Sequence, residues 1–127
     1  MVFRYARHTD NYDAIIDFYS KLLGLEILFS FDEHNGYKGV FFGKKGENWH
    51  LEFTSSDTKA EHSFDEDDIL VFYPKELQEY QGILERIKKN ALSIIPSKNP
   101  YWNENGHMIL DPDGFRVVIS GLEVQNH

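Results

Sequence analysis

The sequence predicts an α+β fold in which two βαβββ modules form one shared concave sheet with the helices on its outer side. Three observations predict this fold. Apolar periodicity alternates between strand-like and helix-like in the same order twice, with a period of about 64 residues. Each helical segment has one apolar face, and turns containing Gly or Asn separate the short strands. The length of 127 residues suits a single domain. We therefore expect one domain over 1–127, with module one at 1–56, a polar linker at 57–67 and module two at 68–121.

Module one begins with a predicted strand at residues 2–8. A helix is expected next, over "NYDAIIDFYSKLLG", because Asn11 can cap its start and Gly24 can end it. Three strands follow, with an Asn35-Gly36 pair typical of a hairpin turn between the first two. Their sequences are "LEILFSF", "YKGVFFG" and "NWHLEFT".

Module two repeats the order. A strand at "DILVFYP" precedes a helix at "KELQEYQGILERIKKN", whose buried face we expect to hold Leu77, Tyr80, Leu84 and Ile87. Three strands are predicted after it, at "LSIIPS", "GHMIL" and "FRVVIS". The last of them is entered through "DPDG", where Pro112 suits the second position of a type I turn and Gly114 closes it.

Strand alternation assigns the side chains to faces, because residues two apart point the same way. Apolar Leu51 and Phe53 should face a helix, and so should Val117 and Ile119. The residues between and beside them should then line the concave side. This inward set is Arg4, Ala6, His8, His50, Glu52, Thr54, Asp68, Leu70, Phe72, Arg116, Val118 and Ser120.

Composition excludes several classes of function. The net charge is −8 and no basic stripe is present, so we expect no nucleic-acid partner. No apolar run approaches the roughly 18 residues of a membrane helix and no signal peptide is apparent, so we expect no membrane partner and a cytoplasmic location. The absence of cysteine excludes disulfides, thiolate metal sites and cysteine nucleophiles.

The segments "DFYSKLLGL", "HLEFT" and "DPDGFRVV" occur in an order and at a spacing that resemble the vicinal oxygen chelate (glyoxalase/bleomycin-resistance/dioxygenase) superfamily. More narrowly, "HNGYKGVFFG", "LVFY" and "NPYW" resemble its YycE-like branch. The resemblance implies a glyoxalase-like fold and a homodimer. It implies less about activity, because one fold hosts many chemistries.

In metal-dependent members the resemblance implies one ligand from each of four strands. The corresponding positions here are Arg4, Glu52, Asp68 and Val118. Valine has no ligand atom and a guanidinium repels a divalent cation, so we predict no metal at this place and no cofactor. We expect Arg4 to form a bidentate ion pair across the cup with Glu52 or with Asp68 instead.

Two other sites stay open. A displaced metal site could use His8, His50, Glu52 and His107, because His50-x-Glu52 supplies two ligands from one strand. His8 could also serve as a general base oriented by Asp10 or Asp13.

The sequence best fits a small-molecule-binding protein that lacks the inherited metal. The acidic, aromatic composition favours a cationic or aromatic organic ligand, and the resemblance implies sequestration of a drug or xenobiotic. Tyr101 and Trp102 lie on a polar loop expected to edge the cup. A metal-dependent lyase, thiol transferase or dioxygenase using Glu52 and histidines is the alternative, so enzyme activity stays open, as does a regulatory module with no ligand. The candidate ligand-binding residues are Arg4, His8, His50, Glu52, Tyr101, Trp102 and Arg116.

Overall fold

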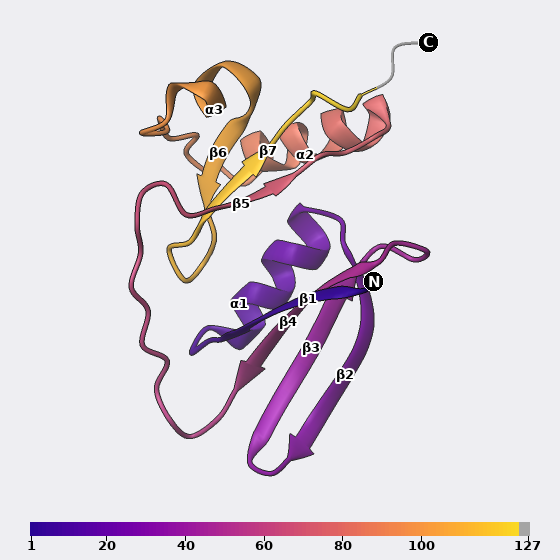
Figure 1. Ribbon diagram of the computed structural model, residues 1–127, viewed down its shortest axis with the longest axis vertical. Helices are drawn as coiled ribbons and strands as arrows, with labels where there is room; N and C mark the ends of the chain where they lie inside the picture. The colour runs from indigo at the N-terminus through magenta and orange to yellow at the C-terminus, as the bar shows by residue number, and fades with distance from the viewer. Residues whose placement is uncertain (125–127) are drawn as a thin grey trace. The chain divides into compact units, whose positions relative to one another are not determined.

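The structure, a computed structural model, describes residues 1–124 and divides into two compact units, Met1–His62 and a second that begins at Ser63. Both combine a sheet with helices, which confirms the predicted α+β class (Figure 1). Within residues 1–124, the helices are all too short or too polar to cross a membrane.

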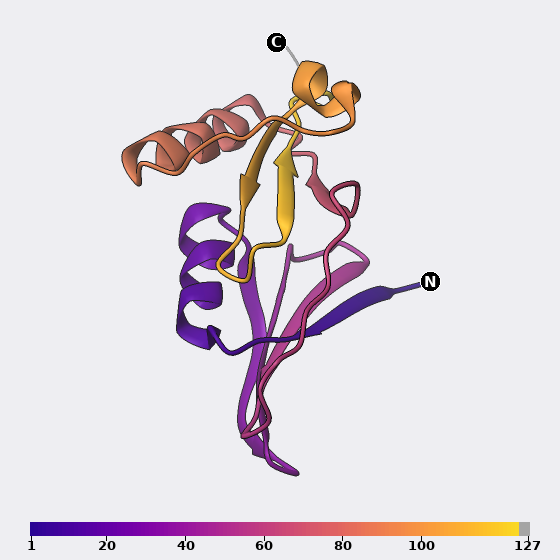
Figure 2. The same ribbon diagram turned by 90° about the vertical axis from the view of Figure 1, so that its left-hand side faces the viewer.

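The first unit is a four-stranded sheet with one helical segment along one of its faces (Figure 2). Its strand order is β1-β4-β3-β2, and only the β1–β4 pair is parallel. The elements are β1 (Phe3–His8), α1 (Tyr12–Ile16), the π-helical η1 (Asp17–Leu22), β2 (Glu26–His34), β3 (Tyr37–Gly43) and β4 (Trp49–Ser55).

Aromatic packing holds the helical segment to the sheet. The ring of Tyr19 lies 4.8 Å from that of Phe53 and 6.0 Å from that of Phe42, centroid to centroid, and all three side chains are fully buried. The segment continues α1 as a π-helix, in which the Leu23 amide donates to the Phe18 carbonyl five residues earlier. It ends at Gly24, whose positive φ of 75° confirms its predicted role.

Two local predictions in this unit have different outcomes. Asn11 precedes α1 but its side chain makes no capping hydrogen bond; its own amide donates to the Thr9 hydroxyl instead. The cap prediction is therefore wrong. Asn35 and Gly36 have φ values of 54° and 86°, so the predicted hairpin turn is confirmed.

Residues 56–62, which we call the strap, run back along the end of β1. Thr58 and His62 hydrogen-bond to His8, and the Ala60 amide donates to the Asp10 carboxylate at 3.0 Å. These bonds make the strap part of the first unit.

The second unit is a three-stranded sheet in the order β5-β7-β6, with β5 parallel to β7. Its elements are β5 (Ile69–Phe72), α2 (Leu77–Lys89), α3 (Pro100–Asn105), β6 (His107–Leu110) and β7 (Arg116–Ile119). The turn before β7 forms as predicted, with the Gly114 amide donating to the Asp111 carbonyl at 2.9 Å.

The second unit departs from the predicted βαβββ order. The segment "LSIIPS" forms no strand, only an isolated bridge between Ile95 and Met108. Pro96 has no amide hydrogen to extend that bridge into a ladder. "NPYW" is the start of α3 rather than a loop: the Asn99 side chain accepts from the Tyr101 amide, and Pro100 fills the first helical position.

Two face assignments here are corrected. In β5 the register pairs Leu70 with Val117 and Phe72 with Ile119, and partners in a parallel pair share a face. Leu70 and Phe72 therefore lie on the same face as Val117 and Ile119, not on the opposite face.

In α2, Leu77 is exposed, and Ile83, which was not predicted to be buried, is buried together with Ile87. The helix starts two residues later than predicted, so Leu77 lies in its frayed first turn.

Candidate functional site

The sheet of the first unit has one face covered by α1 and η1 and a second face that we call the distal face. Strand register identifies the second face, because Arg4, Ala6 and His8 pair with His50, Glu52 and Thr54 in parallel β1 and β4. Glu52 and Thr54 in turn oppose Phe41 and Gly39 of β3. The predicted inward residues of β1 and β4 therefore do share one face. Its members are Arg4, Ala6, His8, Leu28, Phe29, Phe31, Tyr37, Gly39, Phe41, His50, Glu52 and Thr54.

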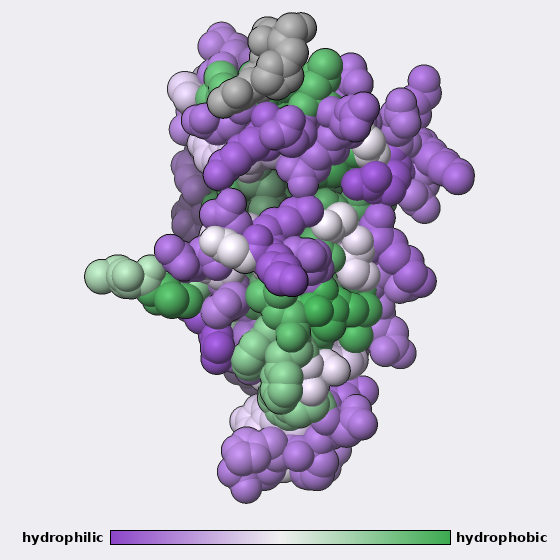
Figure 3. All heavy atoms as spheres, turned by 90° about the vertical axis from the view of Figure 1, so that its right-hand side faces the viewer, coloured by the Kyte–Doolittle hydropathy of each residue, from purple (hydrophilic) through white to green (hydrophobic). Residues whose placement is uncertain are grey.

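A β-bulge in the edge strand β2 adds aromatic side chains to the distal face. Ile27 pairs with Phe42 on the helix side, but the register shifts by one residue and Phe29 then pairs with Phe41. A bulge places two consecutive residues against one on the partner strand, so Phe29 and Phe31 turn to the distal face. Phe29 is 56% exposed, and its ring lies 5.6 Å from that of Phe41. Figure 3 shows the resulting apolar area over β2.

Arg4 lies over this aromatic row. Its guanidinium carbon is 4.2 Å from the centroid of Phe41, a cation–π contact. Its Nη1 atom is 4.0 Å from Glu52 Oε1, so the predicted pair forms as a loose ion pair, not a bidentate one. The prediction placed the two side chains on opposite strands, whereas β1 and β4 are neighbours. The Arg4 side chain is exposed and stacks on Phe41, and both facts explain why it does not form a closer ion pair with Glu52.

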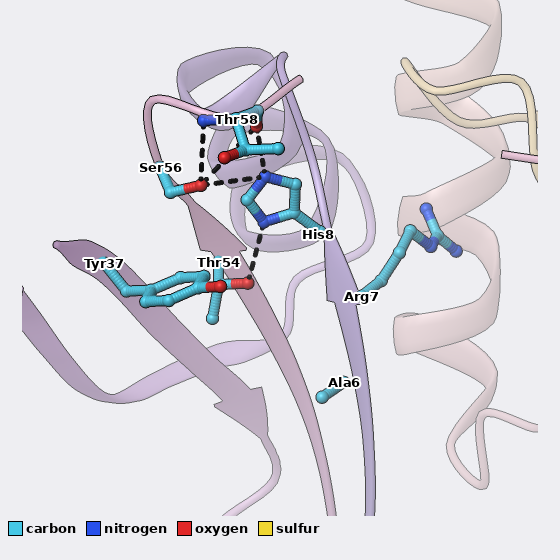
Figure 4. Close-up of a pocket in the computed structure, with 7 residues that line it drawn as sticks. All are labelled: Ala6, Arg7, His8, Tyr37, Thr54, Ser56 and Thr58. Atoms are coloured by element: carbon cyan, nitrogen blue, oxygen red, sulfur yellow. Dashed lines mark hydrogen bonds between the residues drawn. The ribbon is translucent and has the colours of Figure 1, made fainter. Parts of the chain in front are cut away.

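A cavity of about 340 Å³ adjoins the distal face at the His8 end of β1. The lining residues, drawn in Figure 4, are Ala6, Arg7, His8, Tyr37, Thr54, Ser56 and Thr58. The Arg7 side chain points away from the others (Figure 4), towards the helix-covered face, where its guanidinium lies 5.2 Å from the Phe53 ring. What faces the cavity is thus one imidazole, a set of hydroxyl groups, and the apolar surface of Ala6 and of the Tyr37 ring.

The imidazole of His8 is held from both sides. Its Nε2 atom donates to the Thr58 carbonyl at 2.8 Å, because a carbonyl can only accept. Ser56 Oγ is 3.3 Å from the same nitrogen, and Thr54 Oγ1 is 3.3 Å from Nδ1. The Tyr37 ring meets the imidazole edge-on at 6.0 Å.

This arrangement corrects the general-base prediction. The groups that orient His8 are Thr54, Ser56 and Thr58, and the Asp10 carboxylate is engaged by the Ala60 amide instead. Sequence reasoning missed Ser56 and Thr58 as lining residues. The signal was present as a hydroxyl-rich run, "TSSDT", that continues the alternation of β4 beyond its end.

His50 lies on the distal face beside Gly43 of the neighbouring strand β3. Its Nδ1 atom is buried and has no hydrogen-bond partner within residues 1–124. Its ring is oriented by packing rather than by a polar contact.

The remaining predicted residues belong to the second unit. Tyr101 and Trp102 lie on α3 with their rings edge-on at 4.9 Å, and Arg116 begins β7. Their part in a site shared with the first unit stays a prediction.

The four positions at which relatives bind metal do not fit a divalent cation here. Glu52 has Arg4 beside it, Asp68 precedes β5, and Val118 is a fully buried hydrocarbon side chain. Within either unit, the described residues 1–124 hold no group of three His, Asp or Glu side chains such as a metal site requires. The set His8, His50, Glu52 and His107 spans the two units and stays a prediction.

Comparison with known proteins identifies the family. Residues 3–54 match the YycE-like N-terminal domain and residues 67–121 match the YycE-like C-terminal domain. The chain is 40% identical over 119 residues to the uncharacterised protein YycE of Bacillus subtilis (strain 168), covering 91% of this chain and 84% of that protein.

Solved structures agree. A crystal structure of a YycE protein from Bacillus subtilis superposes with a TM-score of 0.82 at 37% identity, covering 99% of this chain and 91% of the other. The trypanothione-dependent glyoxalase I of Leishmania major superposes with a TM-score of 0.72 at 19% identity, covering 95% of this chain and 86% of the other. The antibiotic-binding protein TnmS3 of Streptomyces sp. CB03234 superposes with a TM-score of 0.65 at 16% identity, covering 94% of this chain and 93% of the other. The last two likenesses show the fold alone. The chain therefore belongs to the YycE-like family, and its fold is that of the glyoxalase/bleomycin-resistance proteins.

Proposed function

We propose that this protein binds a small organic ligand with a flat ring system on the distal face of its first sheet, without the metal that other members of the superfamily use. The observation that carries the proposal is the aromatic row of exposed Phe29 and half-buried Phe31 and Phe41. An exposed apolar patch costs solubility unless something covers it, and aromatic rings offer a ligand both area and stacking geometry. The bulge in β2 turns Phe29 away from the helix-covered core and onto this face.

A positive charge on the ligand has a defined place. A cation would lie beside Glu52 and the ring of Phe41, the two groups that Arg4 also contacts. The net charge of −8 favours the approach of a cation over that of an anion.

Sequestration of a drug or xenobiotic is the form of binding we propose. TnmS3, which shares this fold, is an antibiotic-binding protein, and this supports the proposal. We also propose a cytoplasmic homodimer, as the resemblance implies.

The test is a titration of the purified protein with cationic and neutral aromatic compounds, followed by calorimetry and by amide shifts in NMR spectra. We expect binding that perturbs β2 and β3, and at least fivefold weaker affinity for Phe29→Ser. Ile94→Ser is the matched control, because Ile94 is a similarly exposed apolar residue (53%) in the second unit. Unchanged spectra throughout the panel, or equal losses in both variants, would contradict the proposal.

Metal analysis separates this function from the metal-dependent alternative. Protein purified without a histidine tag should contain no stoichiometric transition metal. Stoichiometric metal that disappears in Glu52→Ala would show that the metal-free proposal is wrong.

A further inference from the structure

We infer that the cavity beside His8 is a subsite for a carboxylate on the ligand. The inference rests on the proposed function, because the ring that bears this carboxylate would lie on the aromatic row. It assigns the ligand a second functional group and an orientation. The ring system lies over β3 and β2, and the carboxylate enters between His8, Tyr37 and the strap.

The cavity offers hydrogen-bond donors. Tyr37, Thr54 and Ser56 each present a hydroxyl at its wall, and no Asp or Glu lines it. The Tyr37 hydroxyl makes no hydrogen bond within the described residues 1–124. Ser56 Oγ accepts from the Thr58 amide at 3.2 Å, and its own proton has only the distant Thr58 carbonyl at 3.5 Å. Both hydroxyl protons are therefore available to a guest.

The acceptors around the cavity are already occupied. The Thr58 carbonyl accepts from His8 Nε2, the Thr54 carbonyl accepts from the Thr9 amide at 2.8 Å, and the His8 carbonyl accepts from His62 Nε2 at 2.7 Å. A guest group with N–H donors would have to share carbonyls that each already accept one hydrogen bond. A group that accepts from the two available hydroxyls fits this set, and an ionised carboxylate is such a group.

The tautomer of His8 decides which hydroxyls can donate to a guest. Because Nε2 carries the hydrogen that bonds to Thr58, the Nδ1 atom of a neutral ring accepts from the Thr54 hydroxyl. The Thr54 proton is therefore already engaged. A carboxylate accepts from the Tyr37 and Ser56 hydroxyls instead.

The spacing of Glu52 and Thr54 along β4 sets the distance between the two charged groups of the ligand. Thr54 and Glu52 are two residues apart on β4, which separates them by roughly 7 Å along the strand. A carboxylate at Thr54 and a cation beside Glu52 would therefore lie one aromatic ring apart. The face is built for an amphoteric aromatic compound.

The test uses four probes that share one benzene ring: 4-(trimethylammonio)benzoate, benzoate, benzamide and phenyltrimethylammonium. Calorimetric titration of the full-length protein should find the zwitterion tightest, and benzamide at least tenfold weaker than benzoate. The double variant Tyr37→Phe/Ser56→Ala should remove the preference for benzoate and leave the affinity for phenyltrimethylammonium unchanged. Tyr37→Phe should lower benzoate affinity by itself, which keeps the test independent of how the double variant folds.

Ser30→Ala is the control, because Ser30 pairs with Val40 on the opposite face of the sheet. Benzamide binding as tightly as benzoate, or a carboxylate preference that survives in the double variant, would overturn the carboxylate subsite and leave the aromatic binding face standing. Failure of all four probes to bind would overturn both proposals.

Discussion

Arg4 decides which cations the distal face can accept. It lies over Phe41 and within 4.0 Å of Glu52, so it competes with a ligand's positive charge for the same ring and the same carboxylate. Arg4→Ala should therefore strengthen binding of phenyltrimethylammonium by about fivefold to tenfold, the equivalent of about 1 kcal/mol for one exposed cation–π contact.

A matched control for Arg4 exists on the other face. Lys38 lies 4.6 Å from the centroid of the Tyr12 ring, beside α1 rather than the distal face. Calorimetric titration should show no change in ligand affinity for Lys38→Ala. Weaker cation binding by Arg4→Ala would show that Arg4 helps to hold the ligand.

Tyr12 should lose its phenolic proton at a higher pH than an ordinary tyrosine. Burial raises the pKa of Tyr12 above its ordinary value of 10.0, and the nearby charges of Asp32 and then Asp13 raise it further. The phenol thus keeps its proton in the folded protein at a pH where the unfolded chain has lost it. Its contribution to stability is complete below pH 10 and is lost as the pH rises through the higher folded pKa.

The difference in absorbance at about 295 nm between the protein and Tyr12→Phe isolates this residue. Asp32→Asn should lower the pKa of Tyr12. Ionisation of Tyr12 at or below the ordinary tyrosine value would contradict the prediction.

Side-chain contacts were only partly predictable. Alternation placed Arg4, Glu52, His8 and Thr54 on one face correctly, because β1 and β4 have no bulge between them. The geometry of the Arg4–Glu52 pair was not predictable, since it depends on Phe41, a residue the sequence could not place under the guanidinium.

At the scale of elements, β2 shows where strand patterns fail. The segment "LEILFSF" contains a bulge, so simple alternation loses its phase after Ile27. The same limit explains β5, a strand of four residues, where an error of one residue inverts both faces. Helix α3 was signalled by its Asn99 cap and Pro100, but two aromatic residues in a polar segment favoured a loop.

The aromatic row depends on a glycine in β3. A Cβ atom at Gly39 would lie 2.5 Å from the Phe31 ring, closer than atoms can approach. Gly39→Ala should therefore displace Phe31, lower the free energy of unfolding in urea by about 1–3 kcal/mol and weaken ligand binding.

Adding Phe31→Ala should recover most of the stability lost in Gly39→Ala, because it removes the clashing ring. Gly82→Ala in α2 is the control and should stabilise by about 1 kcal/mol, since a Cβ there meets only the flexible Arg86 side chain. If the Gly39→Ala single variant were as stable as the parent protein, β3 would tolerate a methyl group at residue 39 and the prediction would be wrong.

At the scale of the whole molecule, the repeat predicted the fold class but overstated the symmetry, and the family was predicted from the resemblance of separate short segments. Both units contain a sheet and helices, yet the second sheet has three strands where four were expected. The repeat is visible in the order of apolar patterns, whereas strand formation also depends on backbone donors such as the one Pro96 lacks. Ligand chemistry was least predictable, because the cavity is completed by a strap that the sequence presents as linker.

Association can be measured directly. We expect a homodimer, so sedimentation velocity should give twice the chain mass of 14.9 kDa at micromolar concentration. A single species of one chain mass over the whole concentration range would contradict it.

The strap also limits where segments of two related proteins can be joined in a chimera. A chimera joined at residue 56, where the last strand of the first sheet has ended, would take Thr58 and His62 from a different parent than His8. A junction between His62 and Ser63 keeps all of these partners from one parent. Natural recombination among relatives would face the same constraint, so specificity should be inherited with the first 62 residues as a block.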